Sequence, residues 1–344
     1  MTEKQWEILL RVVNGETLDK DPTGFIIDSP WLPGWFGIST IDYYVSENMW
    51  FDANLSAVNA FPNTIFLPGF WSEFGMCTEP SAFGSKQTWS LNNLPYSGKI
   101  ITDAQDVVNI EKPNVRTDGL LPFMIMRLVH NEERIKKSGH LIKFAVSRGP
   151  LNIASFLMGT TELMMGVKTI PEKIHSFLTV ITDFIVDWIT LQAETFKSIE
   201  GILVLDDIVG FLGEGDFKEF ALPYLKDIYQ QTNMKVNFFH NDAKGLITAK
   251  YLTEIGVNLF NFSYEHSIRE IQDLTKGEVA LLGNIPPRDV LAAGSPHDVI
   301  ESVKILLNSD MDRKGVILSC GGGMPPDVPT ENIQAFIDTV EEFA

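Results

Sequence analysis

The chain has 344 residues, of which 44% are hydrophobic and 21% are charged, as is ordinary for a globular protein with a large core. Its formal net charge of -18 argues against nucleic acid and anionic membranes as partners, because both bind proteins through concentrated Lys and Arg. Cys77 and Cys320 are too few for a disulfide framework, and no apolar run follows a basic N-terminal segment, so we expect a cytoplasmic protein.

The predicted elements begin with an amphipathic helix and continue with strands that alternate with helices. Residues 2–14 place Trp6, Leu9, Leu10 and Val13 on one helical face, which we expect to flank the base of a barrel. Eight short apolar runs predict strands at 25–28, 63–70, 141–150, 201–210, 235–242, 257–264, 278–285 and 315–323. Helical spacing occupies 42–60, 152–199, 216–231, 244–255, 266–275, 297–308 and 330–343. This order predicts an α/β fold, a (β/α)8 TIM barrel forming a single domain over residues 1–344.

A long insertion follows the second predicted strand. Residues 71–125 are rich in Gly, Pro, Ser and Trp and lose the regular spacing, so we expect a lid or pocket wall that covers the site. Farther along, Pro171 predicts a helix start, because proline is tolerated in a first turn. The apolar helical stretch 176–193 carries Asp183 and Asp187, so we expect no membrane span there.

Polar or reactive residues follow the predicted strands. They occur at 28–30, 69–73, 147–150, 206–207, 240–242, 263–266, 283–284 and 319–323. In a barrel of this type the loops after the strands build the active site. These positions are therefore the candidates for catalysis and binding.

The strongest chemical pattern is His240, Asp242 and Cys320. An imidazole, a carboxylate and a thiolate converging from different strands suit a catalytic Zn²⁺ with one open coordination position. The alternative is that Cys320 packs as a small buried hydrophobe while His240 and Asp242 only form hydrogen bonds. Asp206, Asp207 or Glu265 could lie nearby.

The two adjacent acids Asp206 and Asp207 point to opposite sides of a strand, so at most one faces the barrel axis. One of them could instead cap the helix that opens near Gly215 and Asp216.

Glycine-rich and aromatic loops complete the candidate site. Gly149–Pro150 and Gly321–Gly323 could cradle a phosphate, but tight turns at a crowded barrel mouth explain them better, since no Lys or Arg follows the triple glycine before Pro325. The first two strand-end loops are rich in aromatic residues, and such loops either line an apolar ligand pocket or belong to the core. They contain Trp31, Trp35, Phe70, Trp71, Phe74 and Phe83. We assign substrate binding to Trp31, Trp35, Phe70, Trp71 and Asp206.

Several long segments resemble the uroporphyrinogen decarboxylase superfamily, and within it the corrinoid-dependent methyltransferase branch. They are SRGPLNIASFLMG (147–159), LDDIVGFLGEGDFKEFALPYLKDI (205–228), VNFFHNDAKG (236–245), LLGNIPPRDVLAAGSPHDV (281–299) and LSCGGGMPPDVPTENIQAF (318–336). The resemblance extends over nearly the whole chain and implies a TIM barrel independently of the strand count.

The resemblance to the decarboxylases themselves fails at functional positions. Their N-terminal Arg-rich segment corresponds to residues 23–37, which contain no arginine. The Ser after their strand-four Asp is Asp207 here, and the His of their last glycine-rich loop is Gly322. An acidic protein without these arginines is poorly matched to a porphyrinogen with its eight carboxylates.

In the methyltransferases that serve coenzyme M, zinc is bound by a His-x-Cys pair on strand five and a Cys on strand eight. This chain keeps His240 and Cys320 and has Asp242 in place of the first Cys, which leaves a more Lewis-acidic centre suited to oxygen. The segment FLPGFWSEFGMCTEPSAFG (66–84) resembles the substrate component of anaerobic O-demethylases.

The resemblance therefore implies transfer of a methyl group from a methoxylated aromatic compound to the Co(I) corrinoid of a separate protein. Zinc held by His240, Asp242 and Cys320 would activate the ether, with Asp207 or Glu265 completing the metal site or donating a proton. The corrinoid protein is expected to dock over the barrel mouth, against residues 71–125.

Other functions stay open at this point. A methylcobalamin:thiol methyltransferase would use the same metal in the opposite sense, and a porphyrinogen decarboxylase-type lyase or a relative with a decayed site are further alternatives. The sequence leaves the oligomeric state open and is compatible with a homodimer.

Overall fold

The computed structural model describes residues 1–243 and 246–343, and within these residues eight strands form a parallel α/β barrel. The strands are β1 (Gly24–Ile26), β2 (Ile65–Leu67), β5 (Phe144–Arg148), β6 (Gly201–Leu205), β7 (Val236–Asn241), β8 (Leu259–Phe262), β9 (Ala280–Ile285) and β10 (Val316–Cys320). A parallel ladder runs from β5 to β10, and β1 pairs with β2. An isolated bridge between Thr23 and Leu318 joins the two groups. This confirms the predicted fold class and all eight predicted strands in their order.

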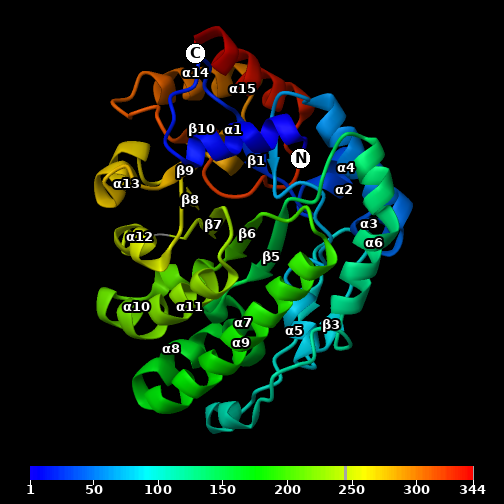
Figure 1. The fold of residues 1–344 in the computed structure, drawn as a ribbon, viewed down its shortest axis with the longest axis vertical. Helices are drawn as coiled ribbons and strands as arrows, with labels where there is room; N and C mark the ends of the chain where they lie inside the picture. Colours follow the sequence, from blue (N-terminus) through cyan, green and yellow to red (C-terminus); the bar gives the residue numbers. More distant parts are fainter. Residues whose placement is uncertain (244–245, 344) are drawn as a thin grey trace.

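The strands are short and apolar because both of their faces are covered. Every residue of β5, β6, β9 and β10 is buried, as expected when side chains fill the barrel on one side and helices pack on the other. Figure 1 shows helices arranged around the strands. Polar side chains instead gather at and just after the C-terminal strand ends, and most of them are buried there.

The helices fall close to the predicted ranges. They are α1 (Glu3–Val13), α2 (Leu32–Phe36), α3 (Thr40–Val45), α4 (Glu47–Ala60), α5 (Thr78–Ala82), α6 (Leu121–Lys137), α7 (Pro150–Met158), α8 (Thr160–Thr169), α9 (Pro171–Thr195), α10 (Glu214–Phe220), α11 (Leu222–Thr232), α12 (Leu252–Ile255), α13 (Ile268–Thr275), α14 (Pro296–Leu307) and α15 (Thr330–Phe343). Pro171 begins α9, as predicted. Residues 244 and 245 of the predicted helix 244–255 lie outside the described residues. Helices α2, α5 and α6 were not predicted.

Helix α1 lies across the base of the barrel, as expected. Gln5 Nε2 donates to the carbonyl oxygens of Pro62 and Thr64, which precede β2, at 3.2 and 3.0 Å. Trp6 meets Phe144 at the start of β5 edge to face, with 5.6 Å between ring centroids. Figure 1 shows α1 crossing the strands. Val12 is buried on this helix, whereas the predicted face residues Leu10 and Val13 are half-buried.

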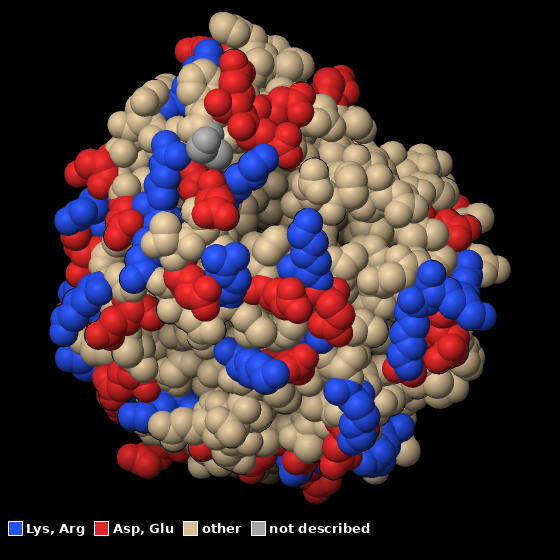
Figure 2. Space-filling model, turned by 45° about the horizontal axis from the view of Figure 1, so that its top comes forward, with Lys and Arg blue, Asp and Glu red and all other residues tan. Residues whose placement is uncertain are grey.

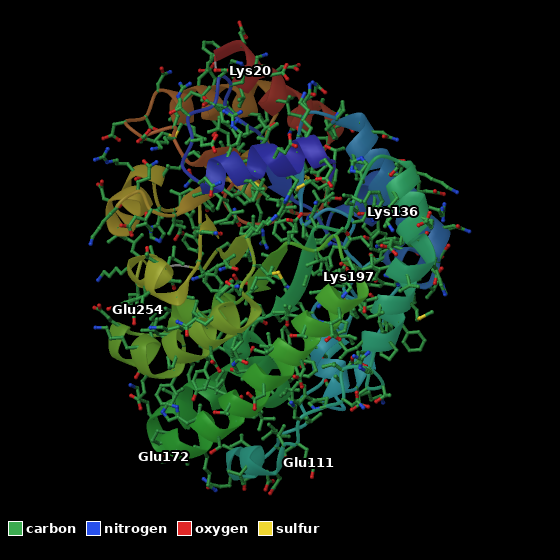
Figure 3. All side chains as sticks on the ribbon, in the orientation of Figure 1. Lys20, Glu111, Lys136, Glu172, Lys197 and Glu254 are labelled. Carbon is green, nitrogen blue, oxygen red and sulfur yellow. The ribbon has the colours of Figure 1, made fainter. Side chains whose placement is uncertain are left out.

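The insertion 71–125 does not lie over the barrel mouth along its whole length. After the hairpin of β3 (Gln87–Thr88) and β4 (Tyr96–Ser97), the chain follows the outside of α8 and α9. Ion pairs hold it there, and they join Lys99 to Glu162, Lys112 to Asp187 and Arg116 to Glu194. Figure 3 shows Glu111 and Glu172 at the same end of the molecule. The expectation of a lid is therefore wrong for residues 99–118, which pack against helices instead.

Helix α9 is long and apolar enough to cross a membrane by length and composition, contrary to the prediction from Asp183 and Asp187. Its most apolar window has a mean hydropathy of 1.4 and is 56% buried. Phe184 and Trp188 are fully buried within the protein, so α9 has the character of a core helix.

The surface of the protein carries charges of both signs. On the face drawn in Figure 2, Lys and Arg side chains are interspersed with Asp and Glu side chains.

Candidate active site

His240, near the C-terminal end of β7, is held in one orientation by Asn261 of β8. The two residues are register partners, and His240 Nδ1 lies 2.8 Å from Asn261 Oδ1. Asn261 Nδ2 donates to the carbonyl oxygens of Leu282 and Cys320 at 2.8 and 3.4 Å, so its oxygen must be the acceptor toward His240. The Nδ1 of His240 therefore carries the proton, and Nε2 keeps a free lone pair.

Two carboxylates meet this imidazole. His240 Nε2 lies 3.7 Å from Asp207 Oδ1, and the backbone N–H of Asp242 donates to the same oxygen at 3.1 Å. One ligand atom from each of Asp207, His240 and Asp242 lies within 4.8 Å of the others. Burial raises the pKa of Asp207, with Asp242 adding to the shift and His240 opposing it. A bound cation would relieve the repulsion between the two carboxylates.

This arrangement fits zinc. An imidazole nitrogen and two carboxylate oxygens are ordinary Zn²⁺ ligands, and three protein ligands leave a coordination position open in catalytic sites. The bond from Nδ1 of His240 to Asn261 is the outer-shell contact that metal-ligating histidines generally make. The same residues thus offer a site for a Lewis acid at the barrel mouth.

Cys320, the third predicted ligand, stands apart from this cluster. It is the last residue of β10, is fully buried, and its Sγ donates a weak hydrogen bond to the carbonyl oxygen of Gly322 at 3.6 Å. Burial raises the pKa of the Cys320 thiol to about 12, which favours the protonated form. Asp207 takes the position in the cluster that the sequence assigned to Cys320, whose ligand role stays a prediction.

Asp206 and Asp207 point in different directions, as their adjacency requires. Asp206 is fully buried, and its Oδ2 accepts from Leu151 N at 2.9 Å in the first turn of α7. It therefore caps α7, not the helix near Gly215, and no ligand reaches it without a rearrangement. A Cβ on Gly149 would lie 2.5 Å from Asp206 Oδ2, which explains the glycine there. Burial raises the pKa of Asp206 to about 8.

Glu265 lies on the exposed loop after β8, where its backbone N–H donates to Ser263 Oγ at 3.3 Å. Its carboxylate is not part of the cluster formed by Asp207, His240 and Asp242. The proposed proton-donor role of Glu265 stays a prediction.

The predicted aromatic residues separate into packed ones and one at the mouth. Trp31 is fully buried, and its Nε1 donates to the carbonyl oxygen of Val328 at 3.0 Å. Trp35 packs against Trp31 with 4.9 Å between ring centroids and a tilt of 31° between the planes, and buried Phe70 packs against Phe51 of α4. Trp71 instead lies under the guanidinium of Arg148, 5.7 Å from its ring centroid. Trp71 thus approaches Arg148, and Phe74 likewise lies under the guanidinium of Arg127, 4.6 Å from its ring centroid.

The inner wall of the mouth also holds a group of charged residues, of which the sequence interpretation named Asp28, Glu73 and Arg148 only as part of the polar strand ends. Arg148, the last residue of β5, interacts electrostatically with Asp28, Glu73, Glu79 and Asp207. Their positions at or after the ends of β1, β2 and β5 place them among the strand-end loops. A single carboxylate or arginine in such a loop forms no recognisable sequence motif. The barrel geometry is what brings them together.

The triple glycine acts as a close-packing loop, as the sequence favoured. Gly322 has a φ of 110°, and a Cβ there would lie 2.6 Å from Asp242 Oδ2. A Cβ on Gly321 would overlap the backbone of Tyr264 in the loop after β8. The glycines let the β10 loop approach the β7 and β8 loops and keep Asp242 in place.

Comparisons with known proteins agree with this architecture. Similar proteins include the uroporphyrinogen decarboxylase of Psychromonas ingrahamii, 24% identical over 280 residues, which are 78% of this chain and 76% of that protein. The Danio rerio uroporphyrinogen decarboxylase is 29% identical over 182 residues, 51% of this chain and 48% of that one. A solved structure described as a methyltransferase from Methanosarcina mazei has a TM-score of 0.81 over 97% of both chains, and at 17% identity it shows a shared fold. A family model described as uroporphyrinogen decarboxylase (URO-D) matches residues 8–343, and the chain therefore belongs to that family.

Proposed function

We propose that this chain is a methyltransferase that moves a methyl group from a methoxylated aromatic compound to the Co(I) corrinoid of a separate protein. The observation that carries the proposal is the cluster of Asp207, His240 and Asp242 at the barrel mouth, with Trp71 beside Arg148 on the same inner wall. The cluster offers oxygen and nitrogen ligands, and the aromatic ring offers an apolar surface for an arene.

The reaction sets the chemical requirement. Cobalt(I) donates an electron pair to the methyl carbon, the carbon–oxygen bond breaks with its pair on the oxygen, and cobalt becomes formally Co(III). A phenol with a pKa near ~10 is a mediocre leaving group, so the departing oxygen needs an electrophile or an acid. Zinc bound at the cluster would supply Lewis acidity at that oxygen.

The chain's own residues have separate tasks in this proposal. His240 Nε2 and the carboxylates of Asp242 and Asp207 would hold the metal, while Asn261 keeps the imidazole in the required tautomer. Trp71 orients the arene. Glu265 stays the proposed proton donor to the phenolate, and the exposure of Asp242 leaves the site open toward solvent and the methyl acceptor.

The rival functions fit the site less well. A thiol methyltransferase of the coenzyme M type uses two thiolates, whereas here Asp242 replaces one and the pKa of Cys320 is raised to about 12 by burial. A porphyrinogen decarboxylase must bind many carboxylates, whereas Arg148 here already interacts electrostatically with Asp28, Glu73 and Glu79. The site is therefore better matched to a neutral ether.

The partner, the assembly and the location belong to the same proposal. The methyl acceptor is a separate corrinoid protein that approaches the barrel mouth near residues 71–79, the part of the insertion that contributes to the inner wall. A homodimer and a cytoplasmic setting are compatible with it.

The test combines this protein, a chemically reduced corrinoid protein and methoxylated aromatics of varied substitution. We expect loss of the Co(I) absorbance, appearance of methylated corrinoid and release of the free phenol, each requiring all three components. Demethylation without corrinoid, or thiol methylation from methylcobalamin at a comparable rate, would contradict the proposal.

A further inference from the structure

A large apolar pocket lies between α3, α6 and the chain after β3, and it shares no residue with the cluster of Asp207, His240 and Asp242. Its volume is 670 Å³, and apolar side chains make up most of its lining. Figure 1 shows α3 and α6 next to each other at the edge of the molecule. Pockets of this size and composition are typical of sites for small ligands.

The buried part of the pocket is aromatic and closely packed. Trp89 meets Tyr44 and Phe74 edge to face, with 5.8 and 6.2 Å between ring centroids. Tyr44 and Phe74 are buried, and the Tyr44 hydroxyl donates to Ser29 Oγ at 2.7 Å, which holds this ring from behind. Phe123 of α6 is exposed at the rim. The pocket therefore combines a fixed aromatic floor with an apolar rim that a ligand could cover.

Arg127 of α6 also lines the pocket, and within residues 1–243 and 246–343 no carboxylate forms an ion pair with it. It is only 4% exposed, and its guanidinium lies over the Phe74 ring, 4.6 Å from the centroid. Its hydrogen-bond acceptors among these residues are two backbone carbonyl oxygens, that of Glu73 at 3.4 Å and that of Tyr44. A guanidinium has five N–H donors, so three of them are left for a ligand.

The acidic residues beside Arg127 are bonded to other groups. Glu73 meets the guanidinium through its backbone carbonyl, while its carboxyl accepts hydrogen bonds from two backbone N–H groups. Glu47, on the rim, has its Oε1 3.0 Å from His130 Nδ1. A buried charge is normally paired, so the arginine favours an anion as the ligand of this pocket.

We propose that the pocket is a second ligand site, which binds a small acid made of an aromatic ring joined to a carboxylate. The ring would contact Trp89 and Phe123, and the carboxylate would accept hydrogen bonds from Arg127. The two oxygens of a carboxylate match the planar fork of a guanidinium, and hydrogen bonds between charged partners are among the stronger ones. The inference does not depend on the proposed methyl transfer.

The test measures dissociation constants by calorimetry for 3-phenylpropionate, 3-phenylpropan-1-ol and 3-phenylpropylamine, which share a ring and a chain and differ in charge. We expect the acid to bind at least about tenfold more tightly than the alcohol, because it alone offers a charged acceptor to Arg127. The amine should bind more weakly than the alcohol, since its cation would approach the guanidinium.

Two substitutions locate the site. Arg127→Met retains a long side chain without the charge and should remove the preference for the acid over the alcohol. Phe123→Ser should weaken binding of the acid severalfold by removing part of the apolar rim. Phe211→Ser is the matched control and should leave the affinity unchanged, since Phe211 is 65% exposed, as against 64% for Phe123, and does not line the pocket.

Equal or tighter binding of the alcohol by the unaltered protein, or no binding of the acid at millimolar concentration, would overturn the proposal. A preference for the acid that persists in folded Arg127→Met would overturn it as well, by placing the carboxylate on another cation. Should Arg127→Met not fold, the two exposed positions decide, and equal affinities for the acid in Phe123→Ser and Phe211→Ser would contradict a site in this pocket.

Discussion

At the scale of single residues, the site depends on which atom of each side chain is free. Asn261 uses its amide nitrogen for two carbonyls, so its oxygen fixes the proton on His240 Nδ1 and leaves Nε2 for a metal. Asp207 turns toward His240 while its neighbour Asp206 turns into the protein. These orientations decide which residues can act together.

Replacing Asn261 by Ala should lower the zinc affinity by about 10–100-fold, the usual effect of removing an outer-shell partner of a ligating histidine. Competition with a chromophoric chelator measures this directly. Asn92→Ala, at an exposed loop position, is the control and should keep the affinity of the unaltered protein. An Asn261→Ala protein that is folded and binds zinc normally would show that the imidazole does not need this partner.

The ligand set can be decided by comparing Asp207→Asn with Cys320→Ser. The cluster geometry predicts the larger loss of zinc for Asp207→Asn, because Asp207 lies within the cluster and the Cys320 thiol, whose pKa is raised to about 12, does not. Metal content after dialysis against a fixed zinc concentration gives the ranking. The opposite ranking would restore the set of His240, Asp242 and Cys320 that the sequence predicted.

At the scale of secondary-structure elements, the loops after the strands are held together by close backbone contacts and by one buried cap. Gly322 allows the β10 loop to pass beside Asp242, and Asp206 at the end of β6 caps the first turn of α7. The positions of the side chains in the cluster therefore depend also on residues that lie outside it.

Gly322→Ala should weaken zinc binding more than it lowers the melting temperature. The added Cβ would lie 2.6 Å from Asp242 Oδ2 and would strain a backbone with a φ of 110°, so Asp242 must move. Gly323→Ala is the matched control, since a Cβ there meets nothing within 4 Å. Equal zinc affinities in the two variants would mean that Asp242 is not a ligand.

Asp206 should make the protein less stable as the pH rises. Its pKa is about 8 in the folded protein and near ~3.9 in an unfolded chain, so the folded state holds a proton that the unfolded state releases between these values. The contribution is complete below about pH 4 and is lost as the pH rises through about 8. Urea unfolding at pH 5 and pH 9 should show a smaller difference for Asp206→Asn than for the unaltered protein.

Asp206→Ala should in addition lower the free energy of unfolding by about 0.5–2 kcal/mol, the usual effect of losing an N-terminal helix cap. An unchanged pH dependence in Asp206→Asn would contradict the assignment of a raised pKa to this carboxyl. Asp310→Asn, at an exposed position, serves as the control for the loss of one charge.

The elements were largely predictable from the sequence because a barrel strand buried on both faces leaves a short apolar run with a polar end. That pattern identified β5 to β10 and brought His240 and Asp242 to one edge. It could not show that Asp207 and not Cys320 would join His240 and Asp242, because a strand-end position does not fix which side chains approach within bonding distance of one ion. Asp28 and Arg148 were among the polar strand ends, but their interaction could not be predicted, since it depends on loops from distant parts of the chain.

At the scale of the whole molecule, the insertion divides into two parts with different roles. Residues 71–79 contribute Trp71, Glu73 and Glu79 to the inner wall, whereas residues 99–118 are tied to α8 and α9 by exposed ion pairs. Each exposed ion pair of this kind contributes only about 0–1 kcal/mol to the free energy of unfolding. A corrinoid protein that approaches the mouth would therefore meet the first part and the loops after β7 and β10.

The most direct measurement follows one turnover with a methoxylated phenol whose methyl carbon is labelled with ¹³C, mixed with this protein in its zinc-loaded form and a stoichiometric Co(I) corrinoid protein. We expect equal amounts of free diphenol and ¹³C-methylated corrinoid, and we expect chelated protein or His240→Ala to produce neither. Release of the diphenol with the label recovered elsewhere than on cobalt, or full turnover by the metal-free protein, would contradict zinc-assisted methyl transfer to a corrinoid.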